Sequence, residues 1–332
     1  MYAEKISQFV RRLLAYVLMP LAVSAVSLSA VAAPLKVGYS DWPGFVAWQV
    51  AIDKGWFKKE GVDVSFEWFD YSASMDAFAA GKLDGVGLTN GDTLVIGSGG
   101  TKGVMLLVTD YSSGNDMIIA KHGIETIADL KGKKVAVEQG LVDHLLLLNA
   151  LKKAGLNESD VILVNAKTND MPQVLASQDV SAVGVWQPIA GEALKAVPGS
   201  KAIYTSADQP GLIYDGFVAS PSSVKARRAD WQKFVKVWGK VVAYINDPKT
   251  QPDAVKIMAA RSGISPAEYL PLLKGTRLLT LAEARKVYIK GDGFDSLYGS
   301  GKIVDTFNVA NKVYAKPEDV GSYIDASFTN AK

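Results

Sequence analysis

A pattern of alternating strand-like and helix-like segments occurs twice in this chain at a nearly constant offset. Phe78 and Gly87 each have a counterpart 97 residues later, and the Lys58-Lys59 pair has one 94 residues later. A repeat of this length predicts a fold built from two similar units. The matching segments are LKVGYS (35–40), KKEGVDVSFEWF (58–69) and FAAGKLDGVGLT (78–89) in the first copy, and KKVAVE (133–138), VILVNA (161–166) and LASQDVSAVGVW (175–186) in the second.

Each copy alternates strand, helix, strand, helix and strand, which predicts a parallel sheet with right-handed crossovers. We therefore expect an α/β fold of two doubly wound lobes that face each other across a cleft. Two segments, VMLLVTDY (104–111) and AIYTSA (202–207), are predicted to carry the crossovers between the lobes. On this interpretation lobe 1 comprises 33–111 plus 208–332, and lobe 2 comprises 112–207.

Both ends of the chain depart from this repeat. Near the N-terminus, Arg11 and Arg12 precede an uncharged stretch that ends in the small-x-small pattern Ala30-Val31-Ala32. This order is typical of a signal peptide, so we expect residues 1–32 to be cleaved near Ala32-Ala33 and the mature protein to reach the periplasm. A retained membrane anchor is the alternative, but the apolar run is short and interrupted by serines. After about Val224 the pattern becomes helical, and SYIDASF (322–328) is expected to dock as a tail.

The composition limits the classes of partner and chemistry. The chain has no cysteine, so an exported protein of this sequence must be held together by its core alone. Removal of residues 1–32 leaves 33 basic and 33 acidic residues without a basic block, which argues against a nucleic-acid partner. The two histidines, His122 and His144, fall in different expected elements, so we expect no metal site. We also expect no cofactor, and a monomer.

The predicted topology indicates where a ligand would bind. In open parallel sheets, ligands lie beyond the carboxyl ends of the strands, where helix N-termini also point. This rule selects the loops 40–44, 69–72, 89–93, 138–144 and 186–188.

The charges of these loops favour a cationic ligand. Residues 33–226 contain no arginine, the side chain best suited to bind sulfonate, nitrate or carboxylate oxygens. The loops instead carry aspartates, a glutamate and aromatic residues, and further aspartates (110, 116 and 215) lie near the crossovers. Carboxylates beside aromatic faces bind small cations through charged hydrogen bonds and cation–π contacts. The candidate ligand-binding residues are Asp41, Trp42, Asp70, Tyr71, Asn90, Asp92, Thr93, Glu138, Gln139, Asp143, His144, Trp186, Gln187 and Asp215.

Structural roles remain open for several of these candidates. Asp41 and Asp92 are also suited to cap helices, and Asp143 to complement a helix dipole. His144 precedes four leucines, which equally indicates a core histidine. An anionic ligand also stays open, because helix N-termini, hydroxyl groups and Lys167 are able to bind an oxyanion. A zwitterion such as taurine would need both kinds of partner.

The motifs of this chain resemble those of the periplasmic solute-binding proteins of ABC importers in the nitrate/sulfonate/taurine/bicarbonate group. SSGNDMIIA (112–120) and VEQGLVDHLLLL (137–148) are most similar to the branch found beside urea carboxylase, which is linked with guanidine-type and other small nitrogen-rich solutes. The resemblance implies the type II periplasmic binding protein fold, and a membrane permease with its ATPase as partners. The segments that carry it are DKGWFKKEGVDV (53–64), FAAGKLDGVGLTNGDT (78–93), IADLKGKKVAVEQG (127–140) and AVGVWQP (182–188).

An enzyme is the competing class, because a fold does not fix a function. The thiamine-pyrimidine synthases resemble this group in fold, but they carry a cysteine-rich segment that this chain lacks. No nucleophile elbow, phosphate-binding loop or dinucleotide fingerprint occurs either. We therefore expect a binding protein that captures a small, nitrogen-containing cation by lobe closure, with taurine or another sulfonate as the alternative solute.

Overall fold

Two β-sheets form the framework of this computed structural model, which describes residues 33–330. The expected signal peptide lies outside the described residues. The strand order is β11-β4-β10-β3-β1-β2 in one sheet and β7-β6-β8-β5-β9 in the other. We use lobe 1 for the part built on the six-stranded sheet and lobe 2 for the part built on the five-stranded sheet. The strands are β1 (Leu35–Tyr39), β2 (Val64–Trp68), β3 (Gly85–Thr89), β4 (Val104–Ser112), β5 (Asp116–Ala120), β6 (Lys134–Val137), β7 (Ile162–Asn165), β8 (Ala182–Trp186), β9 (Lys201–Thr205), β10 (Tyr214–Ala219) and β11 (Thr276–Leu278).

The repeat correctly predicted the parallel centre of each sheet. In lobe 1, β1 pairs in parallel with β2 and β3, and in lobe 2, β6 pairs in parallel with β7 and β8. Antiparallel strands extend both sheets beyond these predicted pairs, so each sheet is mixed. β10 and β11 pair antiparallel with β4, and β5 pairs antiparallel with β8 and β9. At the two crossings, β5 and β10 run against the repeat strands, whereas β4 and β9, which pair antiparallel with them, run in the same direction as the repeat strands.

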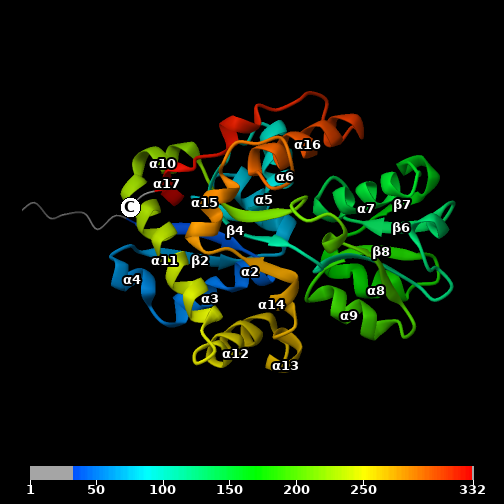
Figure 1. The fold of residues 1–332 in the computed structure, drawn as a ribbon, viewed down its shortest axis with the longest axis horizontal. Helices are drawn as coiled ribbons and strands as arrows, with labels where there is room; N and C mark the ends of the chain where they lie inside the picture. Colours follow the sequence, from blue (N-terminus) through cyan, green and yellow to red (C-terminus); the bar gives the residue numbers. More distant parts are fainter. Residues whose placement is uncertain (1–32, 331–332) are drawn as a thin grey trace, which may run out of the picture. The chain divides into compact units, whose positions relative to one another are not determined.

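Helices cover the faces of both sheets. Figure 1 shows α7 on one face of the five-stranded sheet and α8 and α9 on the other, all in green. In lobe 1 the long helix α11 packs against α3, α4 and β4. The helices are α2 (Pro43–Val46), α3 (Trp48–Asp53), α4 (Trp56–Glu60), α5 (Tyr71–Ala79), α6 (Asn90–Ser98), α7 (Val142–Lys153), α8 (Met171–Ala176), α9 (Ile189–Ala196), α10 (Pro221–Ala226), α11 (Arg228–Asn246), α12 (Gln251–Ser262), α13 (Pro266–Tyr269), α14 (Leu272–Gly275), α15 (Leu281–Val287), α16 (Leu297–Ala310) and α17 (Ser327–Asn330).

The core of lobe 1 is aromatic, and the C-terminal segment closes it. Trp48 is fully buried and stacks on Phe234 of α11 with ring centroids 4.5 Å apart. As predicted, the segment 322–328 docks: Ile324 forms a β-bridge with Met105 of β4, and Phe328 is buried. Large aromatic side chains bury enough apolar area to hold such a core without disulfides.

The chain crosses between the sheets twice, as the sequence indicated. The first crossing joins β4 to β5 and the second joins β9 to β10. A hydroxyl pair links them: Ser112 Oγ lies 2.6 Å from Ser206 Oγ, which also accepts a 2.7 Å hydrogen bond from the backbone N–H of Gly114. Both serines are buried, so the two crossings are held together at one point. The lobe boundaries given above remain a prediction.

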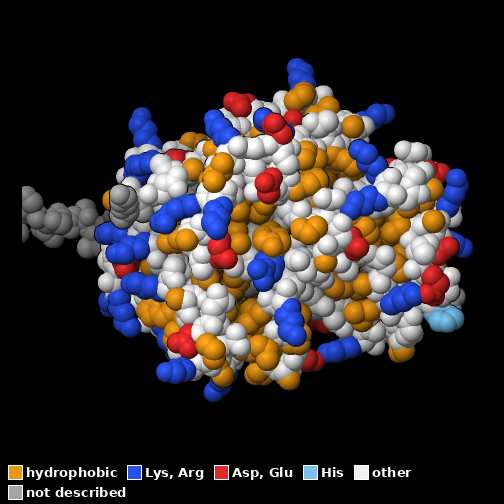
Figure 2. Space-filling model, in the orientation of Figure 1, with side chains coloured by type: hydrophobic (Ala, Val, Ile, Leu, Met, Phe, Trp, Pro, Cys, Tyr) orange, Lys and Arg blue, Asp and Glu red, His pale blue; other side chains and the backbone are white. Residues whose placement is uncertain are grey.

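Over residues 33–330, no helix combines the length and the apolar character that a membrane span requires. Figure 2 shows Lys and Arg side chains scattered over the surface that it displays, interspersed with acidic and apolar ones.

Candidate functional site

The loops selected from the sequence meet between the two sheets. Trp186 ends β8 in lobe 2, and its indole N–H donates a 3.1 Å hydrogen bond to Oδ1 of Asp41, which follows β1 in lobe 1. The same indole packs edge-on against the ring of Tyr71, with centroids 5.4 Å apart. Tyr71 in turn donates a 2.7 Å hydrogen bond to Asp92. Residues from two strand ends and from the first turns of two helices, α5 and α6, therefore lie together, as the topology rule predicted.

Five buried aspartates gather in this region, and we call them the carboxylate cluster. Lobe 1 contributes one from α6, one from β4 and one from β10, whereas lobe 2 contributes the first residue of β5 and one from the first turn of α7. Each side chain is at most 3% exposed. Ionised carboxylates are rarely buried to this extent without a cationic partner. The cluster consists of Asp92, Asp110, Asp116, Asp143 and Asp215.

Neutral donors hold two members of the cluster in place. Asp110 accepts a 2.9 Å hydrogen bond from the indole N–H of Trp42 and a 2.8 Å hydrogen bond from the Thr109 hydroxyl. Asp92 accepts from the Tyr71 hydroxyl. A glycine is required beside Asp110, because a Cβ atom on Gly44 would lie 2.0 Å from Oδ2 of that aspartate. The aromatic residues of the site thus use their polar edges to orient carboxylates.

The other carboxylates of the cluster have free acceptor atoms. Both side-chain oxygens of Asp143 lack a hydrogen-bond partner, as does one oxygen each of Asp116 and Asp215. The ion pairs found among residues 33–330 all use other acidic side chains. Removing an ionised carboxylate from water without a counter-charge costs several kcal/mol. The cluster therefore requires a positive charge from outside the chain, or protons.

Burial raises the pKa values across the cluster. Loss of solvent raises the pKa of Asp92 and of Asp110 to about 6, and that of Asp116 to about 7, with neighbouring carboxylates adding to the shift of Asp92 and Asp116. The pKa values of Asp143 and Asp215 rise well above the usual range for the same two reasons. At neutral pH the site is thus poised between protonated and ionised states.

Asp110 and Asp215 form a closer pair within the cluster. They are direct neighbours on the antiparallel strands β4 and β10. Side chains opposite each other on adjacent strands lie about 5 Å apart at Cβ, where two negative charges repel strongly. Protonated Asp215 donates a hydrogen bond to Asp110, which raises the pKa of Asp215 further. The pair is therefore built to share one proton.

Several candidate residues have structural partners in this structure. Asn90 links β10 to α16 within lobe 1, donating to Ser300 Oγ and accepting from the Tyr214 N–H, while Thr93 donates to the carbonyl of Thr89, the N-cap of its helix. The side-chain oxygen of Gln187 accepts from the Gly191 N–H. Gln139 is exposed. Their roles in ligand binding remain predictions.

Two further acidic candidates lie at the edge of the cluster. Glu138 is half-buried, and its Oε2 accepts from both the N–H and the hydroxyl of Thr168. Asp70 is exposed and receives a long 3.4 Å hydrogen bond from Asn169 of lobe 2. Lys167, considered above for an anionic ligand, is exposed.

His144 is buried but turns away from the cluster. Its Nδ1 accepts a 3.1 Å hydrogen bond from the Gly140 N–H, and its Nε2 lies 3.6 Å from Glu158 on the outer side of α7. Burial lowers the pKa of His144, so the neutral imidazole is favoured. The side chain thus fits the core-histidine interpretation.

Capping accounts for neither Asp41 nor Asp92. Thr89 is the N-cap of α6 and accepts from the N–H of Asp92, whose own carboxylate is left to face the cluster. Asp41 precedes the N-cap Trp42 of α2 and binds the Trp186 indole instead. Burial raises the pKa of Asp41 to about 6.

The candidate set omitted Asp110 and Asp116, although both belong to the cluster. Each was noted only as lying near a crossover. The sequence nevertheless carries a signal for both residues. Each aspartate lies near the end of an apolar strand, in VTDYS and NDMIIA, and a residue in that position is buried together with its strand. Their convergence depends on the antiparallel strands that the repeat did not predict.

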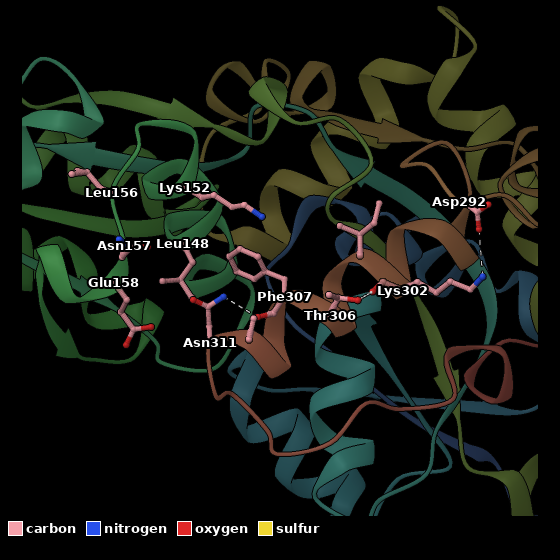
Figure 3. Close-up of a pocket in the computed structure, with 12 residues that line it drawn as sticks. Leu148, Lys152, Leu156, Asn157, Glu158, Asp292, Lys302, Thr306, Phe307 and Asn311 are labelled. Atoms are coloured by element: carbon pink, nitrogen blue, oxygen red, sulfur yellow. Dashed lines mark hydrogen bonds and ion pairs between the residues drawn. The ribbon is translucent and has the colours of Figure 1, made fainter.

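A second feature shared by the lobes is an outer groove of about 660 Å³. Its walls come from the end of α7 and the following turn in lobe 2, and from α16 in lobe 1 (Figure 3). Lys152 lies over the ring of Phe307, 6.0 Å from its centroid, and Lys302 pairs with Asp292. In contrast to the carboxylate cluster, this groove contains lysines and is open to solvent.

Comparison with known proteins assigns the family. The model described as "NMT1/THI5 like" matches residues 42–251, which is more than half of the chain. The chain belongs to this family. Among curated proteins, a "Putative binding protein" of Brucella abortus is 32% identical to this chain over 177 residues, which cover 53% of this chain and 54% of the relative. The taurine-binding periplasmic protein of Escherichia coli is 26% identical over 274 residues, covering 78% of this chain and 82% of the relative. The chain thus spans about half the length of the first curated relatives it matches.

Solved structures confirm the two-lobed type II periplasmic binding protein fold. The aliphatic sulphonate binding protein SsuA of Escherichia coli superposes with a TM-score of 0.73 at 19% identity, covering 88% of this chain and 92% of that one. The desulfurization enzyme DSZB superposes with a TM-score of 0.62 at 16% identity, covering 89% and 97%. The same fold therefore occurs in binding proteins and in an enzyme, and function has to be argued from the site.

Proposed function

We propose that this chain is the solute-binding component of an ABC importer and captures a small, nitrogen-containing cation in the periplasm. The observation that carries this proposal is the carboxylate cluster, in which Asp143 has two unpartnered oxygens and, over residues 33–330, no cationic side chain forms an ion pair with the five aspartates. A ligand with several N–H donors and one positive charge would satisfy these oxygens through charge-assisted hydrogen bonds. Guanidinium and amidinium ions have this chemistry, as do simple ammonium ions.

The mechanism is capture without chemical change. The solute binds the carboxylates of one lobe, the two crossings bend, and the other lobe covers it. A ligand drives such closure only if it interacts better with the closed form than with the open one. Here that difference arises because closure brings the carboxylates of both lobes around a single positive charge. The closed protein then docks on a membrane permease, which an ATPase drives from the cytoplasmic side.

Taurine or another sulfonate is the second candidate solute, and the descriptions of relatives favour it. The ammonium group of taurine would suit the cluster. Its sulfonate group would need hydrogen-bond donors or cationic side chains beside the cluster. Among residues 33–330, however, no Arg or Lys side chain forms an ion pair with any of the five carboxylates. Catalysis of the thiamine-pyrimidine synthase type is not proposed, since this chain has none of the cysteines that those enzymes carry in their cysteine-rich segment.

A thermal-shift panel on the mature chain from Ala33 separates these solutes. It compares guanidinium, acetamidinium, methylammonium, taurine and ethanesulfonate at equal ionic strength. Stabilisation by the first three, or by one of them, supports the cation proposal, because a ligand that binds only the native state raises its melting temperature. Stabilisation by ethanesulfonate without any cation would refute it.

A further inference from the structure

The carboxylate cluster is divided between the lobes. Asp92, Asp110 and Asp215 belong to elements of lobe 1, whereas Asp116 and Asp143 belong to elements of lobe 2. The charges of Asp116 and Asp92 both act on Asp143, and those of Asp110 and Asp116 both act on Asp215. Closure of the lobes therefore assembles like charges that would be apart, and hydrated, in an open molecule.

The carboxylate oxygens without a hydrogen-bond partner belong to both halves of the cluster. Asp143 has two of them at the first turn of α7, and Asp116 and Asp215 have one each. All three side chains are more than nine-tenths buried, so water does not screen them. The closed form without a ligand is consequently stable only when some of these carboxyl groups are neutral.

We propose that protons take the place of the cationic solute in closing the lobes, so that mild acid closes the empty protein and a solute captured in mild acid displaces those protons. In the empty open form at neutral pH, the carboxylates of each lobe are ionised in water. Lowering the pH puts protons on Asp116 and Asp143, which removes the repulsion toward lobe 1. A bound cation removes the same repulsion, and the displaced protons pass to solvent. The second half of this proposal rests on the proposed function, and the first half does not.

The other ionisable groups around the cluster do not provide an opposite charge. Glu138 precedes α7 and acts on both Asp92 and Asp143, while Tyr71 on α5 donates to Asp92. Asp41 is influenced by Asp70 and Glu192, and the phenol of Tyr269 by Asp110 and Asp41. The facing groups are therefore carboxyls and phenols, from α5, α6, α7, α9, α13, β4, β5, β10 and the loops after β1, β2 and β6.

His144 is a neighbouring titratable group whose pKa is lowered by burial, in contrast to the raised pKa values of the aspartates. Its Nε2 faces Glu158 rather than the cluster, and Nδ1 is occupied by the Gly140 N–H. Protonation of His144 would add a positive charge on the outer side of α7. A His144→Gln variant therefore distinguishes its contribution from that of the aspartates.

Small-angle X-ray scattering of the empty mature protein tests the first half of the proposal. We expect the radius of gyration to be smaller at pH 5 than at pH 8 at constant ionic strength. The Asp116→Asn, Asp143→Asn double variant should be as compact at pH 8 as the wild type is at pH 5, because amides cannot ionise. An Asp76→Asn, Asp179→Asn variant, with one exposed aspartate changed in each lobe, serves as the matched control and should behave like wild type, as should His144→Gln.

An equal radius of gyration at both pH values would overturn the proposal, and so would a double variant that does not differ from the control. Circular dichroism verifies that each variant is folded. If the double variant does not fold, the single Asp143→Asn variant decides the same question.

Calorimetry tests the second half. Titration with guanidinium or acetamidinium at pH 6.5, in two buffers of different ionisation enthalpy, should show release of at least about half a proton per solute, and affinity should fall several-fold from pH 7.5 to pH 5.5. Binding without proton release and without pH dependence would overturn the proposal that the solute displaces protons, while leaving the proposed capture of a cation intact. If no cation binds, the proposed function fails, and the scattering experiment still decides whether protons close the lobes.

Discussion

Trp186 of lobe 2 donates its indole N–H to the carboxylate of Asp41 in lobe 1, over 3.1 Å. This hydrogen bond can form only when the lobes are closed, because the two residues follow strands of different sheets. It is a direct polar link between the two lobes at the site.

Trp186→Phe should weaken solute affinity. The phenyl ring keeps the contact with Tyr71 but cannot donate to Asp41, so the closed form loses a hydrogen bond to an ionisable group, worth about 1.5 to 3 kcal/mol. We expect about 10- to 100-fold weaker binding by calorimetry. Trp68→Phe is the control, since Trp68 is partly exposed and lies over Arg261 at the edge of lobe 1. Equal affinities of both variants would show that the Trp186 link does not contribute to closure.

Asp41→Asn should also weaken binding of a cation, by about 1.5 to 3 kcal/mol if the carboxylate forms a charged hydrogen bond to the solute. Glu138→Gln should have a smaller effect than Asp41→Asn, because Glu138 already accepts two hydrogen bonds, from the N–H and the hydroxyl of Thr168, whereas Asp41 accepts one side-chain hydrogen bond, from Trp186. Affinities measured by calorimetry for the two variants check this order. Unchanged affinity in both would restrict these residues to structural roles.

Gly44→Ala should destabilise the protein by displacing the carboxylate of Asp110 in the cluster. A methyl group at this position would collide with the Asp110 carboxylate and break the hydrogen bond from Trp42. Overpacking of this kind lowers the free energy of unfolding by about 1 to 3 kcal/mol, which urea denaturation measures. At Gly99 the nearest atom to an added methyl group is 3.4 Å away, so Gly99→Ala should stay close to wild type. A Gly44→Ala protein of normal stability would mean that Asp110 is free to move.

Ser206→Ala should loosen the junction of the two crossings. The change removes the hydroxyl that joins Ser112 and leaves the N–H of Gly114 without its acceptor. An unsatisfied buried donor lowers the free energy of unfolding by about 1 to 3 kcal/mol. Ser222→Ala, at an exposed position of α10, should change it by less than about 0.5 kcal/mol. Equal stability of the two variants would argue that the serine pair is dispensable.

The stability of the empty protein should fall as the pH rises. The pKa of Asp92 is raised to about 6 and that of Asp116 to about 7, above the ~3.9 of an aspartate in an unfolded chain. The folded protein therefore binds more protons than the unfolded chain in this interval, and stability conferred by the protonated groups is lost as the pH passes through 6 and 7. Urea unfolding at pH 5 and pH 8 should show a decrease of about 1 to 3 kcal/mol, reduced in Asp143→Asn. A rise in stability over this interval would contradict the pKa shifts.

The sequence was informative wherever a local pattern determined the structure. The repeat located the strands beginning at Leu35 and Lys134 and the parallel pairs around them, because hydrophobic strands followed by helices leave few alternative topologies. The topology rule then placed Asp41, Tyr71, Asp92 and Trp186 together. These contacts follow from strand ends that have to face one another once the two lobes close.

What the sequence did not predict depends on long-range pairing. Asp110 and Asp215 are 105 residues apart and become neighbours only through the antiparallel pairing of β4 and β10. Likewise, nothing local to VDHLLLL shows that Asp143 points inward and His144 outward. That difference arises from how α7 packs on its sheet, since consecutive helical side chains point in directions about 100° apart.

The most direct test of the central claim is calorimetric titration of wild type and Asp143→Asn with acetamidinium and with ethanesulfonate at pH 7.5. We predict that wild type binds acetamidinium, that Asp143→Asn weakens this binding at least about 10-fold, and that neither protein binds ethanesulfonate. Binding of ethanesulfonate by wild type, strengthened by the loss of the Asp143 charge, would contradict the account.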